Sequence, residues 1–242
     1  MKLHTVHPDL IEGFKRCLLL VEVVLLAACG NTPAQPDWLI NAYGSLNSYT
    51  QAYLLGNSAV ADVEFARSKQ ALSATGKPEL MARAELLRCA VRTASLEFDT
   101  CPAAQALATD MAAPELAYAA YLTGDTTKLN AAQLAQLPEA HRALAHVSKD
   151  AKDEGTRLAT LAATPDPLAR LVGAGVLMRQ NLLPPAGVAV AVDTASAQGW
   201  RRPLLAWLGV QLKLAQAGTD TEAAARIQRR IDLTQSWPSP VK

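Results

Sequence analysis

Residues 53–57 read Tyr-Leu-Leu-Gly-Asn, and residues 121–125 read Tyr-Leu-Thr-Gly-Asp. In each stretch an apolar run is closed by a glycine and a polar residue. Glycine adopts the left-handed backbone conformation that commonly ends an α-helix. We therefore expect helices to stop at Gly56-Asn57 and at Gly124-Asp125, with tight turns leading into the next element.

A helical pattern continues along the chain. Apolar residues are spaced three or four apart, and the segments that carry them begin at prolines and end at glycines. It predicts helices over 37–55, 58–74, 114–123, 127–137, 138–147, 156–163, 167–183, 185–198, 203–217 and 221–236, with further helices starting at 78 and 102. Residues 188–192 alternate valine and alanine and are the one strand-like stretch, but their neighbours favour a helix.

Composition supports the helical prediction. The chain has 46 alanines in 242 residues, 5% aromatic residues, 50% hydrophobic residues and 19% charged residues. Alanine favours helices, and few aromatic residues disfavour a sandwich or barrel. The net charge of +1 lacks the basic excess of a nucleic-acid-binding protein, so no nucleic-acid partner is predicted.

Short helices joined by tight turns pack as antiparallel neighbours. The predicted fold is therefore all-α, with helical hairpins stacked either as a solenoid or as an irregular helical array. Gly56, Ala61 and Phe65 resemble the spacing around the turn of a tetratricopeptide hairpin, and Gly218, Ala223 and Ile227 repeat it with an aliphatic residue last. The pattern departs from that family near Leu87, where no copy is visible, and at Gln133, where the family has a large apolar residue.

The N-terminus carries a different signal. Lys15 and Arg16 precede an apolar run over 18–28, which is shorter than the roughly 20 residues that span a bilayer. Basic residues, a short apolar run and small residues are typical of a secretory signal peptide. Leu26-Ala27-Ala28-Cys29 resembles the lipobox of bacterial lipoproteins, which implies lipid attachment to Cys29. The alternative is a buried N-terminal helix that ends in a cysteine by chance.

The lipoprotein resemblance sets the expected organisation: a signal peptide over 1–28, a lipidated tether over 29–37, one helical domain over 38–237 and a tail over 238–242. The tether is polar and contains proline, and its eight residues after Cys29 reach roughly 29 Å at about 3.6 Å each. In the bacterial lipoproteins that this leader resembles, an aspartate after the lipidated cysteine retains the protein at the inner membrane. The resemblance therefore implies that Gly30 favours the periplasmic face of the outer membrane, with the inner membrane left open.

Of the four cysteines, Cys17 lies in the leader and Cys29 is the lipidation site, which leaves Cys89 and Cys101 in the body. Two cysteines in an exported protein suggest one disulfide. Such a bridge requires either that the helix carrying Cys89 ends near Ser95 or that the following loop folds back, since the α-carbons of a disulfide lie less than about 7 Å apart. Two separate buried thiols are the alternative. A metal site is not predicted, because no histidine lies near either cysteine.

No catalytic constellation stands out, and no cofactor is predicted. His141 and His146 are five positions apart, so they point to different sides of a helix and are expected to be surface or helix-terminal residues. The stretch over 173–178 resembles the Gly-Ala-x-Gly-Leu-Met segment of lytic transglycosylases, but Asp166 and Glu154 upstream lack that family's glutamate-serine context. A core helix is the favoured interpretation of this stretch, with its two glycines allowing close helix packing.

The charged residues also do not indicate a specific function. Arg201, Arg202, Arg226, Arg229 and Arg230 could together form a basic surface near the C-terminus, or have no role beyond solvation. The favoured function is a lipid-anchored, non-catalytic scaffold that binds another envelope protein. The alternative is an envelope hydrolase acting on peptidoglycan through acids that spacing does not reveal.

Overall fold

Both predicted helix stops are present in the computed structural model, which describes residues 35–148 and 153–236. Gly56 and Gly124 each have φ of +84°, in the left-handed region. The amide of Asn57 donates to the carbonyl of Ala52 at 2.8 Å, and that of Asp125 donates to Ala120 at 2.8 Å. These bonds satisfy carbonyls that the end of a helix leaves without intrahelical donors.

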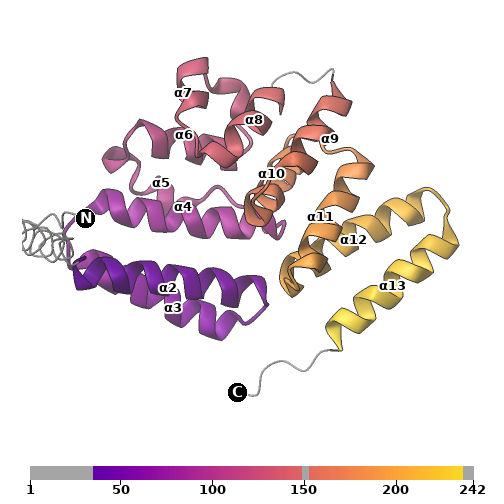
Figure 1. Ribbon diagram of the computed structural model, residues 1–242, viewed down its shortest axis with the longest axis horizontal. Coiled ribbons are helices and arrows are strands. Elements are labelled where there is room, and N and C mark those ends of the chain that lie inside the picture. The colour runs from indigo at the N-terminus through magenta and orange to yellow at the C-terminus, as the bar shows by residue number, and fades with distance from the viewer. Residues whose placement is uncertain (1–34, 149–152, 237–242) are drawn as a thin grey trace, which may run out of the picture. The chain divides into compact units, whose positions relative to one another are not determined.

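The described residues are helical with no strand, so the all-α prediction is confirmed (Figure 1). The α-helices are α2 (Asp37–Leu54), α3 (Ser58–Ser73), α4 (Pro78–Ala94), α5 (Pro102–Gln105), α6 (Ala113–Leu122), α7 (Ala131–Ala135), α8 (Glu139–Ser148), α9 (Glu154–Ala163), α10 (Pro167–Arg179), α11 (Pro185–Ala197), α12 (Arg201–Ala217) and α13 (Thr221–Gln235). Two 3₁₀ turns, η1 (Ala108–Asp110) and η2 (Thr126–Lys128), lie among them. The helices from Asp37 onward form one compact unit.

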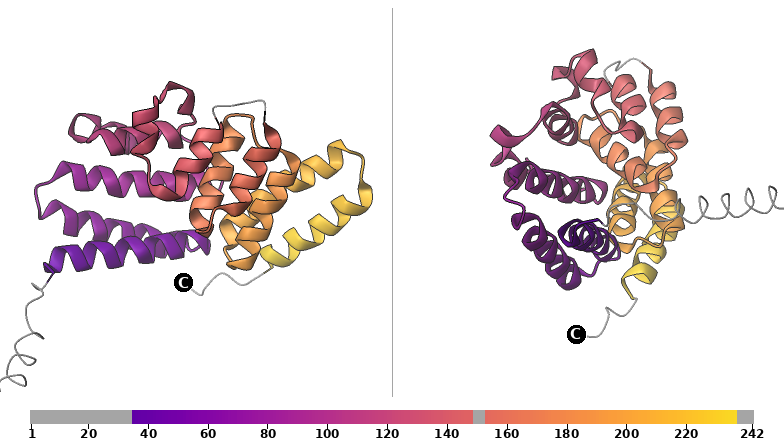
Figure 2. Two further views of the ribbon diagram at one scale, coloured as in Figure 1. Left: turned by 45° about the horizontal axis from the view of Figure 1, so that its top comes forward. Right: turned by 60° about the vertical axis from the view of Figure 1, so that its left-hand side comes forward.

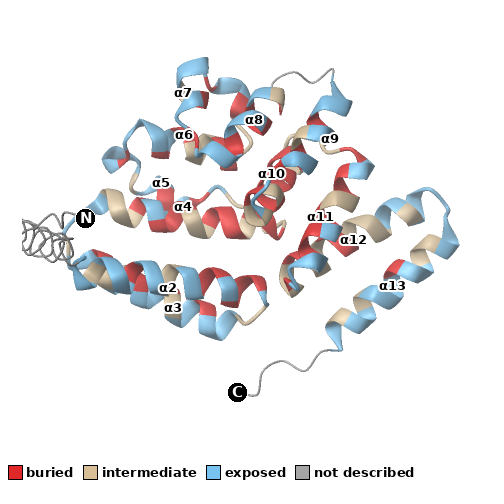
Figure 3. Cartoon of the chain, viewed as in Figure 1, coloured by how far each residue is buried: buried red, intermediate tan, exposed pale blue. Residues whose placement is uncertain are grey.

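Helix α4 is the central element of this unit. It packs against α2, α3, α5, α6 and α10, and its apolar side chains are buried along most of its length (Figures 1 and 3). At its C-terminal end the indole Nε1 of the fully buried Trp207, on α12, donates to the carbonyl of Ala94 at 3.0 Å. The end of α4 therefore has a partner inside the protein in place of water.

Helix α10 approaches α4 closely in the core. A Cβ built on Gly175 would overlap the carbonyl oxygen of Thr93 and lie 2.9 Å from its Cγ2 atom. A Cβ on Gly173 would collide with Leu144 of α8. The predicted role of these glycines in close packing is therefore confirmed, and the stretch over 173–178 lies within a buried core helix.

Hairpins are regular at the two ends of the unit. Helices α2 and α3 form one antiparallel pair, α12 and α13 form another, and α2, α3 and α4 run alongside one another (Figure 2). In the first pair Ala61 and Phe65 are buried, as the hairpin spacing requires. In the second pair Ile227 is buried, while Ala223 is half-buried and most of α13 is exposed.

The middle of the chain is irregular, and the predicted helix over 127–137 is present only in part, as the short α7. The chain forms η2, extends at Leu129 and starts the short α7 after Asn130. The Asn130 side chain accepts from the amide of Gln133, and the Gln133 side chain accepts from the amide of Asn130. Gln133 therefore belongs to a capping box, which is why it does not supply the large apolar residue of the hairpin pattern.

Gly175→Ala is expected to destabilise the protein by about 1–3 kcal/mol, because the new methyl group must displace the backbone of α4. Gly209→Ala on α12 is the matched control, since a Cβ there meets no atom within 4 Å. It is expected to be neutral or stabilising by up to about 1 kcal/mol. Urea unfolding of the full chain measures both, and equal stabilities for the two variants would contradict the packing argument.

Candidate functional site

A groove of about 520 Å³ lies between the α2–α3 hairpin and α4. We call it the α3–α4 groove. Helix α2 contributes two tyrosines, α3 contributes a line of residues over two turns, and α4 contributes two arginines one turn apart. The lining residues are Tyr49, Tyr53, Asp62, Phe65, Ala66, Lys69, Arg88 and Arg92.

The inner wall of the groove is aromatic. The ring centroid of Tyr49 lies 4.9 Å from that of Phe65 and 5.8 Å from that of Tyr53. Tyr49 is only 3% exposed, and its hydroxyl has no hydrogen-bond partner among the described residues. Burial raises the pKa of Tyr49 well above its usual value. The phenol therefore stays protonated, and its O–H is a donor without an acceptor among the described residues.

Cations occupy the rim. Lys69 Nζ lies 2.9 Å from Glu85 Oε1, whereas the guanidinium of Arg88 approaches the other oxygen of Glu85 only to 3.6 Å. Glu85 itself is buried beneath them. Lys69 and Arg88 also stand over the Phe65 ring, at 5.8 and 5.4 Å from its centroid. One buried carboxylate is thus shared by two cations, and the longer contact leaves Arg88 with hydrogen-bonding capacity.

A second set of charges surrounds Arg92, which lines the groove. Arg92 contacts Asp99 at 3.4 Å and Glu97 at 3.9 Å, both longer than a strong charged hydrogen bond. Glu97 lies close to the Tyr53 hydroxyl and, after burial, is the next cause that raises the pKa of Tyr53. Arg92, like Arg88, therefore lines the groove with a guanidinium whose ion pairs are long.

Arg202 does not belong to a basic surface with Arg226. Its Nε donates to the carbonyl of Tyr53 at 2.8 Å, its guanidinium stands 4.2 Å from the Tyr53 ring centroid, and it pairs with Glu97 at 3.2 Å. Arg226 pairs with Glu222 on its own helix. Arg202 therefore holds α12 against the α2–α3 hairpin.

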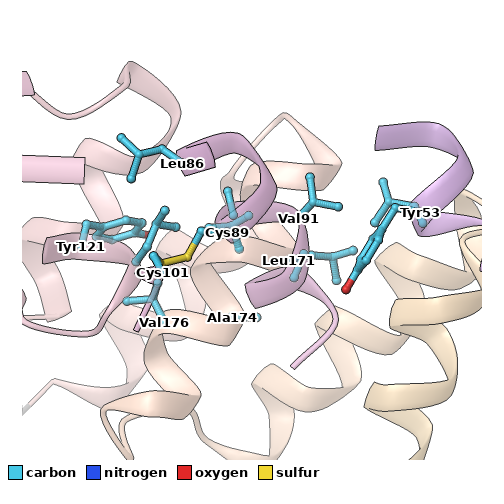
Figure 4. Close-up of a cluster of buried hydrophobic side chains, with 14 of the residues drawn as sticks. Tyr53, Leu86, Cys89, Val91, Cys101, Tyr121, Leu171, Ala174 and Val176 are labelled. Carbon is cyan, nitrogen blue, oxygen red and sulfur yellow. A yellow bond between two sulfur atoms is a disulfide. The ribbon is translucent and has the colours of Figure 1, made fainter. Parts of the chain in front are cut away.

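Cys89 and Cys101 form a disulfide, with their α-carbons 5.7 Å apart (Figure 4). The bridge is possible because α4 ends at Ala94 and the chain turns back through Leu96 and Cys101, both of which have positive φ. Asp99 Oδ1 accepts from the amide of Cys101 at 2.8 Å and fixes this return. Since the two sulfurs are bonded to each other, the cluster of Cys89, Asp99 and Cys101 offers no thiolate to a metal. Cys29 lies outside the described residues.

His141 was expected to be a surface or helix-terminal residue, and it lies in the first turn of α8 but is buried. It is near the start of α8, but its ring faces α6 and lies 5.1 Å from the Tyr121 ring, with Nε2 3.3 Å from the Tyr118 hydroxyl. Desolvation lowers the pKa of His141 to about 4, and nearby Asp166 only partly opposes this. His146, on the opposite side of the helix, is exposed as expected.

Two acids line a separate pocket of about 470 Å³ between α8 and α9, namely Glu139 and Asp166. Asp166 is the N-cap of α10, where its carboxylate accepts from the Ala169 amide at 2.6 Å. Glu154 is exposed in the first turn of α9. The acids that precede the transglycosylase-like stretch therefore cap or begin helices, and they do not converge on that stretch.

Comparison of the chain with protein-family models, with curated proteins and with solved structures found no match. Within residues 35–148 and 153–236, none of the helices combines the length and the apolar character that a membrane span requires.

Sequence reasoning missed the α3–α4 groove. Its signal was present as two pairs spaced i, i+4, Tyr49 with Tyr53 and Arg88 with Arg92, which place like side chains on one helix face. What the sequence does not show is that these faces meet, because that depends on how the α2–α3 hairpin packs on α4.

The buried histidine generates a pH prediction. The pKa of His141 is about 6.5 in the unfolded chain and about 4 in the folded chain. Its contribution to stability is therefore complete above pH 6.5 and is lost as the pH falls toward 4, by about 2–3 kcal/mol. His141→Gln removes the titrating group, so the difference in unfolding free energy between the original chain and the variant is expected to change over this window.

Urea unfolding between pH 4 and 8 measures this difference. His146→Gln is the control, because that side chain is exposed on the same helix. A difference curve for His141→Gln that stays flat between pH 4 and 6.5 would refute the burial argument.

Proposed function

We propose that this chain is a lipid-anchored protein of the bacterial cell envelope that binds another envelope protein and carries out no catalysis. The observation that carries the proposal is the α3–α4 groove, an open aromatic channel with an unused buried donor and partly satisfied guanidinium groups. Binding surfaces of this kind combine rigid aromatic side chains with arginine, which supply most of the free energy in protein interfaces.

Two features support the membrane anchor. The first is the lipobox-like sequence over 26–29, which lies outside the described residues. The second is the start of α2, where Leu39, Ile40 and Tyr43 are 38%, 53% and 73% exposed. Helix α2 begins at Asp37, directly after the expected tether, so this apolar face is the part of the domain closest along the chain to the lipid. In this proposal the anchor holds the domain at the outer membrane, facing the periplasm.

Cys29→Ala is expected to release the protein from the membrane pellet, because the acylated residue is lost. Cys17→Ala is the matched control, since that residue lies in the predicted leader and its removal leaves the lipidation site intact. Fractionation of intact cells with detection in the pellet and supernatant measures both. Retention of the Cys29→Ala variant in the pellet would show that the lipid anchor is wrong.

The groove is tested by photocrosslinking in intact cells. A photoreactive phenylalanine analogue in place of Ala66, an exposed residue of the groove, is expected to capture one protein of defined mass that mass spectrometry identifies. The same analogue in place of Ala140, an exposed residue of the α8–α9 pocket, is expected to capture none.

The second hypothesis, a peptidoglycan hydrolase, is favoured only by the presence of Glu139 and Asp166 in the α8–α9 pocket. It predicts that glycan material crosslinks at position 140 and that the purified chain releases soluble fragments from isolated cell walls. Fragment release that Glu139→Gln abolishes would replace the scaffold proposal, as would the absence of any captured protein at position 66.

A further inference from the structure

We infer that the α3–α4 groove binds a short, extended acidic peptide segment in which two carboxylates flank an apolar residue. This inference rests on the proposed function, because it names the chemistry of the partner that the scaffold binds. It is carried by the buried, unpartnered hydroxyl of Tyr49, by two guanidiniums with long ion pairs, and by the spacing between those guanidiniums.

The hydroxyl of Tyr49 identifies the kind of ligand atom. A buried donor without an acceptor is unfavourable, and native proteins satisfy nearly all such groups. Only 3% of the surface of Tyr49 is exposed, and the residue lines the groove. Its raised pKa keeps the proton on the oxygen, so the hydroxyl lies beside the groove as a donor without an acceptor among the described residues.

The guanidiniums indicate that this acceptor is a carboxylate. Arg88 contacts Glu85 at 3.6 Å, and Arg92 contacts Asp99 at 3.4 Å, so both ion pairs are longer than a charge-assisted hydrogen bond of about 2.7–2.9 Å. Glu85 is already engaged by Lys69 at 2.9 Å. A carboxylate that enters the groove can make the short, planar contacts that the arginines lack in the free protein.

The spacing indicates an extended segment. Arg88 and Arg92 are one turn apart on α4, which places them about 6 Å apart along the helix axis. In an extended peptide, alternate side chains lie on one face at intervals of about 6.6 Å. Acidic residues at positions i and i+2 therefore match the two arginines, while the residue between them points to the opposite wall.

That opposite wall is the face of α3 that bears Phe65 and Ala66. An apolar residue between the two acids would lie against this wall and cover Ala66, which is exposed in the free protein. The wall extends over two turns, from Asp62 to Lys69, or about 10 Å along the axis. This length accommodates about three extended residues, so the recognised core is short.

Direct binding to the full chain, purified in detergent, tests the inference. The probe is a fluorescein-labelled peptide, Gly-Ser-Asp-Leu-Asp-Leu-Ser-Gly, read by fluorescence anisotropy. We expect saturable binding that weakens as salt concentration rises, since exposed charges are screened. The same peptide with asparagine in both acidic positions is expected to bind at least tenfold more weakly.

Two variants locate the site. Tyr49→Phe removes only the unpartnered hydroxyl, so it is expected to leave thermal stability unchanged or higher while it weakens peptide binding about tenfold or more. Arg88→Gln is expected to weaken binding by a similar factor. The matched controls are Tyr43→Phe, at an exposed tyrosine of α2, and Arg67→Gln, at an exposed arginine of α3. Both controls should bind as the original chain does.

Equal binding of the acidic and asparagine peptides would overturn the inference, as would full affinity in Tyr49→Phe and Arg88→Gln. A soluble disaccharide-peptide fragment of peptidoglycan, which also bears carboxylates, is the competing ligand. Its binding in the absence of acidic-peptide binding would equally overturn the inference.

Crosslinking at position 66 distinguishes failure of the proposed function from failure of the acidic-segment inference. If position 66 captures an envelope protein in cells and Arg88→Gln leaves that capture intact, the scaffold stands and the acidic-segment inference is wrong. If position 66 captures no protein, the scaffold proposal is wrong whatever the peptide result.

Discussion

The close approach of α10 to α4 at Gly175 and Thr93 is the contact on which the rest of the structure depends. A helix can pack this closely only where a side chain is missing. The contact buries one long face of α4, and α8 covers α10 on its other side at Gly173. Trp207 and the Cys89–Cys101 disulfide then fix the C-terminal half of α4. Helix α4 is thereby held by contacts that do not involve the α2–α3 hairpin.

This arrangement explains why the groove lies where it does. The face of α4 turned away from α10 meets the α2–α3 hairpin, whose two helices pack far more extensively on each other than on α4. Space for the groove remains between them, with Arg88 and Arg92 on the rigid side and Phe65 on the hairpin side. Arg202 fixes the far end of the hairpin through the carbonyl of Tyr53.

Local signals in the sequence predicted local structure well. Gly56 and Gly124 end helices because glycine tolerates the left-handed conformation, and this requirement is readable without tertiary context. Prediction from the sequence failed where contacts between residues far apart in the chain determine the position of a side chain. His141 is buried because α6 presents two tyrosines to it, and Arg202 is drawn into the hairpin by Tyr53 and Glu97. The groove is such a case, since its residues come from three helices. The lipid anchor at Cys29 stays a prediction.

The central claim is that α4 and α10 form the stable core and that the α2–α3 hairpin unfolds locally without them. Hydrogen–deuterium exchange of the full chain, resolved by peptide mass spectrometry, tests this claim most directly. The account predicts that amides in the middle of α4 and α10 exchange slowest and only with global unfolding, while those of α2 and α3 exchange earlier and as one unit. Exchange in α2 and α3 that is as slow as in α4 would contradict it.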